Sequence, residues 1–377
     1  MFESPPFWMY ILGFLLLLGP LVTVHELGHY LVARWLGVKA EVFSIGFGSE
    51  LTGWTDRRGT RWRVAAIPLG GYVQFKGDMN PASIPDADAL AKATPEEREG
   101  SFHCMALWKR SLIVFAGPAT NILVALAIFA AFFMAFGKPV PVDPSETNII
   151  RSFAPESAAQ HAGAQIGDRI VSIDGDRIDR FEEITDHVLL YPGKEIVLGV
   201  ERDGGRLDLP VTIATSTEQD QFGNESRVGR LGFYSSEYKF ERVGPITAMG
   251  LSINSSVGIV RMMVAGIGQI ISGDRSMREL GGPVRMAKWS GEQLSLGLLP
   301  FINFVALVSL NLAFINLLPI PALDGGHLAF YAAEAVRRKP VGPVGMEWAY
   351  RTGVALVLML MVVVTVNDLV SLPIFGS

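Results

Sequence analysis

Two histidines and a glutamate stand at a spacing that can support metal-assisted hydrolysis. They belong to the segment HELGH at residues 25–29, which follows an apolar run at residues 7–24. On a helix, His25 and His29 lie one turn apart on the same face, so both imidazoles can reach one metal ion. Glu26 is then placed to take a proton from a water molecule that the metal activates. The motif therefore predicts a zinc-dependent hydrolase with Glu26 as its base.

The setting of this motif is more specific than the motif itself. HExxH also occurs by chance, and the simplest alternative is a pair of solvated surface histidines. Here the motif lies next to a run long enough to enter a bilayer. Ionisable groups at membrane depth are costly unless they are paired or bind a metal. A hydrolytic zinc site in a membrane in turn predicts a protease that cuts other membrane proteins.

Composition favours membrane spans combined with a polar insert. The chain has 377 residues, of which 49% are hydrophobic, and a mean hydropathy of +0.33. This length allows two or three structural units. The net charge of −5 argues against nucleic acid as a partner. The single cysteine, Cys104, excludes a disulfide framework and a cysteine-rich metal site.

Four segments are long and apolar enough to cross a bilayer, which takes about 20 residues. They are residues 7–36, 111–136, 299–326 and 348–366. The N-terminus has neither a basic start nor a small-residue cleavage site before HELGH, so we expect a retained span rather than a signal peptide.

Basic residues set the expected orientation. They follow the first span, precede the second, and lie between the third and fourth, at Arg34, Lys39, Lys109, Arg110 and residues 337–339. All three clusters face the cytoplasm if the first span runs inward and the spans alternate. Residues 243–272 are also apolar, but Arg261 and several polar residues interrupt them. We expect an amphipathic helix on the outer surface there, with a fifth span as the alternative.

Residues 149–235 predict a compact β-rich domain. The expected elements are strands at 170–173, 195–202 and 207–214, turns at 174–176 and 203–205, and helical spacing at 181–190. The stretch AGAQIGDRI at 162–170 resembles a signature of bacterial PDZ domains, which bind extended peptides at a sheet edge. A generic small β domain is the alternative. We expect the peptide groove to include residues 231–233.

The loop between the first two spans, about 37–110, is unusually apolar. Residues 61–76 predict two short strands around Gly70 and Gly71. This β-hairpin either dips into the membrane, where it must line a cavity or pack on protein, or lies on the surface. Residues 78–100 are rich in Pro, Ala, Asp and Glu and are expected to form a mobile linker.

A catalytic zinc site usually needs a third protein ligand. The candidates near membrane depth are Asp324, His327, Glu334 and Asp368. Asp324 follows two helix-breaking prolines in NLLPIPALDGG and falls at the inner end of the third span, at the expected depth of the histidines. His327 is one turn further along the helix and could support the site. Glu334 is better explained by pairing with the basic residues 337–339, and Asp368 lies at the opposite end of the fourth span.

Together, HELGHY at 25–30 and NLLPIPALDGG at 316–326 resemble the site-2 protease family of intramembrane zinc metalloproteases. The resemblance is strongest to the bacterial RseP type, which carries a PDZ insert. The segments SIGFG at 44–48, IPLGGY at 67–72 and FAGPATN at 115–121 resemble the same family in the same order. Some relatives have two tandem PDZ domains, whereas we find signals for one.

This resemblance implies zinc held by His25, His29 and Asp324, with Glu26 as general base. It also implies that residues 61–76 form a membrane-associated hairpin near the active site. The buried amides of Asn121 and Asn316 could hold substrate or the oxyanion, or could simply join helices. The strand edge formed by Gly70, Gly71, Tyr72 and the residues up to 76 could bind an unwound substrate by β-addition.

The expected fold is an α-helical polytopic membrane protein, with four transmembrane helices, a membrane-associated β-hairpin and an inserted extracytoplasmic PDZ domain. The expected divisions are 1–137, 138–242 with a core at 149–235, 243–298, and 299–377. The expected function is cleavage of single-span membrane proteins, such as pre-trimmed anti-sigma factors, in a bacterial inner membrane. A silent PDZ-bearing scaffold and a metal transporter are the alternatives. A scaffold needs no Glu26, and a transporter needs polar groups along a path rather than at one depth.

Overall fold

Two compact units make up the chain, and each is described by itself. The computed structural model describes residues 5–78, 94, 98–141, 148–179, 181–219, 225–235, 238–273, 281–339 and 343–370. The bundle unit comprises residues 3–129 and 280–369, and the inserted unit comprises 1–2, 130–279 and 370–377. Most of the linker expected at 78–100 lies outside the described residues.

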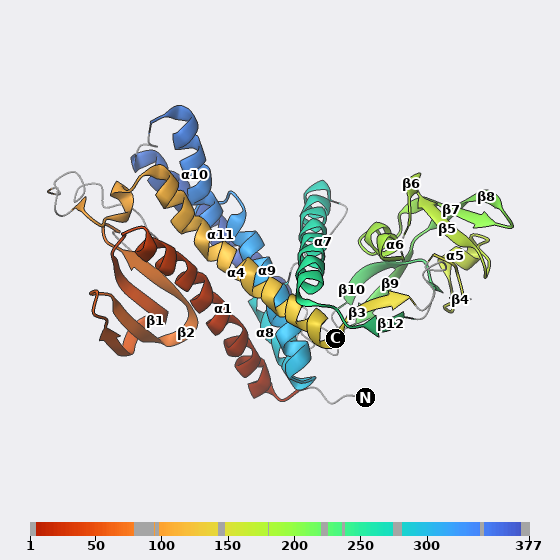
Figure 1. Ribbon diagram of the computed structural model, residues 1–377, viewed down its shortest axis with the longest axis horizontal. Coiled ribbons are helices and arrows are strands. Elements are labelled where there is room, and N and C mark those ends of the chain that lie inside the picture. The colour runs from red at the N-terminus through yellow and green to blue at the C-terminus, as the bar shows by residue number, and fades with distance from the viewer. Residues whose placement is uncertain are drawn as a thin grey trace. The chain divides into compact units, whose positions relative to one another are not determined.

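Long apolar helices form the bundle unit (Figure 1). They are α1 (Phe7–Trp35), α4 (Leu107–Phe136), α9 (Leu298–Leu317) and α11 (Pro343–Val370), joined by the shorter α8 (Pro283–Ser295) and α10 (Asp324–Arg337). Many large apolar side chains on these helices are exposed, among them Leu123 at 64% and Val362 at 60%. Such outward apolar faces are typical of helices that meet lipid.

Five described helices are long and apolar enough to cross a membrane. Four of them, α1, α4, α9 and α11, correspond to the expected spans. The fifth is α7 (Pro245–Ser272), which the sequence placed on the surface. The chain is therefore a largely helical protein with several candidate spans, as expected, but helix length and composition alone leave α7 as a further candidate.

Glycines allow the bundle helices to approach closely. A Cβ atom at Gly28 of α1 would come within 2.6 Å of the Ala116 carbonyl of α4. Near the start of α1, a Cβ at Gly13 would come within 2.7 Å of the Ser290 backbone in α8. Small residues at helix crossings are a general means of packing in lipid, where no hydrophobic force drives helices together.

The helix contacts also fix the directions of the bundle helices. His29 meets Ile113 and His25 meets Asn121, so α1 and α4 are antiparallel. Leu17 and Leu21 of α1 share an apolar cluster with residues of α9, whose continuation carries Asp324 to His25. Helices α1 and α9 therefore run in the same direction.

A curled sheet lies beside α1 (Figure 1) and is formed by β1 (Ala40–Thr55) and β2 (Arg61–Phe75). Phe43 pairs with both Val73 and Trp62, and residues 50–55 pair with 61–65. Two long bent strands thus give four strand segments, in the order 50–55, 61–65, 40–45 and 71–75. The prediction of a hairpin around Gly70 and Gly71 was wrong, because the two halves of β2 pair with β1 instead of with each other. Gly70, at φ 96°, lies at the bend between them.

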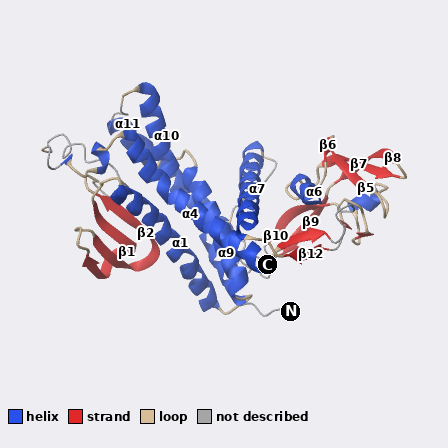
Figure 2. Cartoon of the chain, viewed as in Figure 1, coloured by secondary structure: helices blue, strands red, loops and turns tan. Residues whose placement is uncertain are grey.

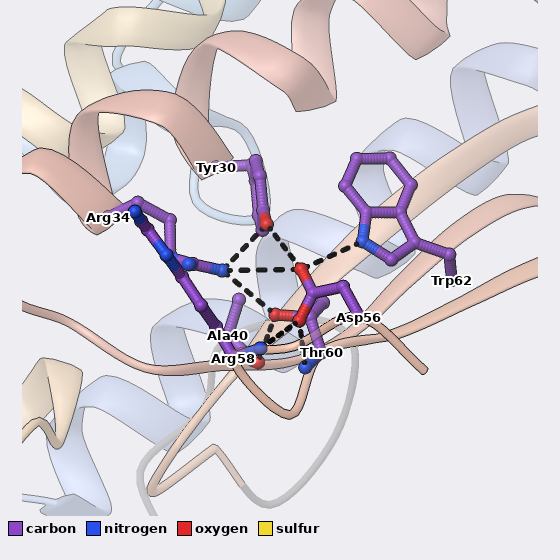
Figure 3. A network of polar contacts seen from close by, with 7 residues as sticks. All are labelled: Tyr30, Arg34, Ala40, Asp56, Arg58, Thr60 and Trp62. Atoms are coloured by element: carbon purple, nitrogen blue, oxygen red, sulfur yellow. Dashed lines mark hydrogen bonds and ion pairs between the residues drawn. The ribbon is translucent and has the colours of Figure 1, made fainter. Parts of the chain in front are cut away.

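A polar network fastens this sheet to the end of α1 (Figure 3). Asp56, in the turn between the strands, accepts hydrogen bonds from Tyr30 and Trp62 at 3.2 Å and lies 3.6 Å from the Arg34 guanidinium. Burial opposes ionisation of Asp56, but the Thr60 and Arg58 amides and the Trp62 and Tyr30 side chains lower its pKa to about 2. A charged Asp56 therefore holds the turn against the last turns of the helix that carries His25 and His29.

The inserted unit contains most of the remaining strands (Figure 2). One sheet has the order β6 (Asp176–Arg177), β5 (Arg169–Ile173), β7 (Glu195–Arg202), β8 (Gly205–Thr212). Three strand pairs complete it, β3 (Lys138–Pro141) with β12 (Tyr238–Glu241), β4 (Ser152–Phe153) with β11 (Phe233–Tyr234), and β9 (Ala214–Gln219) with β10 (Glu225–Arg230). Its short helices are α5 (Ala158–His161) and α6 (Phe181–Val188). The predicted strands, hairpin and helix at 170–214 are confirmed.

A buried ion pair explains the aspartate in the segment AGAQIGDRI. Asp168 is 1% exposed, accepts two hydrogen bonds of 2.7 Å from Arg202, and accepts a third from the Gln165 amide. Burial works against ionisation, but these hydrogen bonds and the Arg202 charge lower the pKa of Asp168. The pair joins the loop before β5 to the end of β7.

We expect Asp168→Asn to weaken the inserted unit, because Arg202 loses a buried charged partner. The expected cost is about 2–3 kcal/mol, since hydrogen bonds to charged groups are worth about 1.5–3 kcal/mol. Amide exchange of β5 and β7, measured in the full chain in detergent, should then be about a hundredfold faster at neutral pH. A lowered pKa stabilises the fold above the unfolded-state pKa, so this difference should shrink below about pH 4.

The control is Asp208→Asn, which removes an ion pair with Arg206 whose side chains are both about 60% exposed. Exposed pairs contribute little, so exchange should stay near wild type. Equal effects of the two substitutions would show that Asp168 has no special structural role.

Candidate metal centre and active site

Three potential metal ligands converge in the bundle unit. His25 and His29 project from the same face of α1, and their Nε2 atoms lie 3.2 Å apart. Asp324 begins α10 directly after the proline-broken segment 318–323, which turns the chain back toward α1. Its carboxylate oxygens lie 3.1 Å from His25 Nε2 and 3.6 Å from His29 Nε2. Among described residues, this is the one group of three or more His, Cys, Asp or Glu side chains with metal-site spacing.

The spacing and surroundings of these atoms fit a zinc ion. Ligand atoms bound to zinc at about 2.0–2.2 Å in a tetrahedron stand about 3.3–3.6 Å apart, close to the distances just given. Gly117 of α4 faces the same space. A Cβ atom there would overlap His29 and come within 2.8 Å of His25 Nε2. The chain therefore keeps open a space that any side chain at Gly117 would fill.

Helix α4 also contacts the rear of both imidazoles. His29 Nδ1 lies 2.8 Å from the Ile113 carbonyl oxygen, to which it can only donate. In the neutral imidazole, His29 Nε2 is then unprotonated and available as a ligand. His25 Nδ1 lies 3.2 Å from the side-chain amide of Asn121, which is fully buried. The sequence left two roles open for Asn121, contact with substrate and a link between helices, and its amide joins α4 to His25 of α1.

Glu26 faces the sheet. Its Oε2 accepts a hydrogen bond of 3.2 Å from the Val73 amide, so the edge segment 71–75 lies directly beside the expected base. Gly71 allows this approach, because a Cβ there would lie 2.5 Å from the Ser44 carbonyl and 3.8 Å from Glu26. The curled sheet thus forms one wall of the site.

A cavity of about 360 Å³ connects these groups. It is lined by His25, Glu26, His29 and Asp324, by Gly71, Tyr72 and Val73 of β2, and by Asn316, His327 and several apolar side chains. Of the residues expected to position substrate, Asn316, Gly71 and Tyr72 line this cavity. Gly70 does not, and instead packs against the Phe47 ring.

The other acidic candidates lie elsewhere. Glu334 pairs with Arg110 at 2.9 Å, and Asp368 accepts hydrogen bonds from the Gly282 and Arg285 amides at the start of α8. His327 lines the cavity but does not belong to the ligand group. Gly117 and the Ile113 carbonyl were not predicted to belong to the site. Gly117 is part of the segment FAGPATN at 115–121, but no sequence signal could show that it faces the histidines.

Comparisons with known proteins agree with this site. The family described as Peptidase family M50 matches residues 13–360. A provisionally named zinc metalloprotease of Rhizobium meliloti is 44% identical over 94% of this chain and 95% of its own length. Metalloprotease MmpA of Caulobacter vibrioides is 35% identical over 96% of both chains.

Among solved structures, the PDZ domain of an SdrC-like protein from Listeria monocytogenes matches 24% of this chain and 87% of its own, at 13% identity. Its TM-score of 0.19 is too low to carry an argument about the fold. The family match and the relatives extend over nearly the whole chain, and they show that it belongs to peptidase family M50.

Proposed function

We propose that this M50 peptidase is a zinc enzyme that hydrolyses peptide bonds in the membrane-spanning segments of other proteins. The observation that carries the proposal is the convergence of His25, His29 and Asp324 within 3.6 Å of one another, with Glu26 in the same cavity. Relatives named as zinc metalloproteases support zinc as the cofactor. The three groups lie on or beside apolar helices, which supports a site at membrane depth.

Each residue then has a definite task in the reaction. Zinc, when bound, supplies the Lewis acidity that activates water and polarises the scissile carbonyl. Glu26 takes the proton of the attacking water and passes it to the leaving amine. Asn316 lines the same cavity and can donate from its amide to the carbonyl oxygen as negative charge develops there.

Substrate presentation is the proposed task of the edge segment 71–75. A helical substrate hides its peptide bonds, so the segment to be cut must first unwind. An extended segment can pair with an exposed strand edge. The position of Val73 beside Glu26 supports this arrangement, because a strand added at that edge would run past the base.

Four membrane crossings are part of the proposal. Helix α4 ends at the side of the bundle where α1 begins, and α8 packs on the first turns of α1 before α9 runs parallel to α1. The chain between α4 and α8 then crosses the membrane an even number of times. Among its described residues α7 is the only candidate span, which supports placing α7 on the surface. Basic residues at the other side of the bundle support a cytoplasmic assignment for that side.

The inserted unit is proposed to be an extracytoplasmic PDZ domain that filters substrates. A groove of about 220 Å³ between α6 and residues 229–234 supports this role, and it includes the predicted 231–233. Single-span proteins already trimmed of their outer domain, such as anti-sigma factors in a bacterial inner membrane, are the substrates that the family resemblance favours. The intact Glu26 argues against a silent scaffold.

The first test separates chemistry from metal binding. We expect Glu26→Gln to keep stoichiometric zinc and lose cleavage of tagged single-span proteins, because the ligands remain and the base is gone. Asp324→Ala should lose both zinc and cleavage, because a ligand is missing. Zinc content of the purified protein and co-expression cleavage assays measure the two properties.

Two controls belong to this test. Glu41→Gln makes the same change on an exposed residue of β1 and should leave both properties unaltered. His327→Ala should keep zinc. If Asp324→Ala retained zinc while His327→Ala lost it, His327 would replace Asp324 in the ligand set. Full activity of Glu26→Gln would remove Glu26 from the mechanism.

Reporter fusions test the membrane topology. A fusion at Arg338 should read cytoplasmic and one at Gly204 extracytoplasmic, because the chain between α4 and α8 is proposed to stay outside. Fusions at Gly273 and Gly244, at either end of α7, should give the same extracytoplasmic reading. Opposite readings at these two positions would make α7 a fifth span.

Deletion of residues 149–235 tests the filter. Short substrates should still be cut and untrimmed substrates should now be cut as well, because the proposed barrier is outside the catalytic cavity. Loss of all cleavage in a folded, zinc-loaded deletion protein would instead make the inserted unit part of the catalytic assembly.

A further inference from the structure

Both metal-site histidines are held from behind by α4, but in chemically different ways. His29 Nδ1 faces a backbone carbonyl, that of Ile113, at 2.8 Å. His25 Nδ1 faces a side chain, the amide of Asn121, at 3.2 Å. A backbone carbonyl is present whatever the residue, whereas the partner of His25 exists only because residue 121 is asparagine.

The tautomer of His25 decides which end of that amide must face it. His25 directs Nε2 toward Asp324 and toward Nε2 of His29. An imidazole that binds a metal through Nε2 carries its proton on Nδ1, so it needs an acceptor there. The amide oxygen of Asn121 accepts, whereas its nitrogen can only donate.

The structure leaves room for this orientation. In the structure, Nδ2 of Asn121 faces His25, and Oδ1 is buried with no hydrogen-bond partner among the described residues. Oxygen and nitrogen of an amide have nearly the same shape, and their assignment follows from the hydrogen bonds they make. Turning the amide over costs no packing and gives His25 Nδ1 the acceptor that metal binding demands.

The position of Asn121 is itself fixed. The hydroxyl of Ser309, fully buried on α9, donates a 2.8 Å hydrogen bond to the backbone carbonyl of Asn121. The amide is thus set at a contact between α4 and α9, and both helices contribute to the position of His25.

We propose that Asn121 is the positioning residue of His25, accepting the Nδ1 hydrogen through its amide oxygen and so presenting Nε2 to the zinc. This inference rests on the proposed role of His25 as a zinc ligand. Of the two roles expected from the sequence, contact with substrate and a link between helices, it replaces the first, because the amide lies behind the imidazole and does not line the cavity.

Zinc affinity of the full-length protein in detergent, measured by chelator competition, tests this proposal. Asn121→Leu has a similar volume but no acceptor, and should weaken zinc binding about 10- to 100-fold, as is typical when the partner of a metal-bound histidine is lost. Asn121→Asp keeps an acceptor at the same position and should stay within about threefold of wild type. This rescue distinguishes hydrogen bonding to His25 from helix packing.

Thr120→Val is the control, because Thr120 also lies on α4 against α1, but among the described residues its hydroxyl bonds the Ala116 carbonyl of its own helix. It should bind zinc like wild type. Thermal unfolding shows whether each variant folds, and Asn121→Ala replaces the leucine variant if that one does not.

Three results would overturn the proposal. Wild-type zinc affinity in Asn121→Leu, with activity lost, would return Asn121 to substrate binding. Equal weakening in the leucine and aspartate variants would show that the amide N–H is the group that matters. Retention of zinc by His25→Ala would reject both this inference and the proposed ligand set. If His25→Ala loses zinc but Asn121→Leu binds it with wild-type affinity, the inference alone is rejected.

Discussion

A carboxylate and two imidazoles inside an apolar helix bundle are stable only when they are paired or bind a metal ion, and much of this structure serves that constraint. Helix α1 brings His25 and His29 to one face, and the break after α9 delivers Asp324 to them. Helix α4 then engages the rear of both rings through Ile113 and Asn121. The polar atoms of the site are therefore arranged by three helices that are far apart in sequence.

Close helix approach is the second requirement, because metal ligands on different helices must come within a few ångströms of one another. Glycine meets it at the points of contact. Gly28 lets α1 touch α4, and Gly117 leaves open the space in front of both histidines. Gly325, next to Asp324, packs against the carbonyls at the end of α9, where a Cβ atom would collide with the backbone. A side chain at Gly28 or Gly325 would push the neighbouring backbone away, and a side chain at Gly117 would fill the site.

In the proposed function, the curled sheet offers strand backbone to an extended substrate, which the helices cannot do because their backbone groups are already paired. Its edge segment 71–75 lies beside Glu26, and the Asp56 network fixes its turn to Arg34 and Tyr30 at the end of α1. Helix α1 therefore carries the base and also holds the turn of the sheet. These contacts fix the position of the proposed substrate-binding edge relative to Glu26, even though β2 and α1 are joined by a long connection.

The sequence by itself determined the parts whose signals are local. The spacing of HELGH, the apolar runs, the DGG hairpin at 203–205 and the prolines before Asp324 each fix a short piece of chain, because helix period, hydropathy and turn chemistry act over a few residues. What only the tertiary structure decided were the contacts between those pieces. The two halves of β2 pair with β1 because a bend at Gly70 carries the chain across the sheet. Asn121 faces His25, and Gly117 faces both histidines, because α1 and α4 cross at Gly28. No periodicity encodes such a crossing, since it depends on how close two helices can pack.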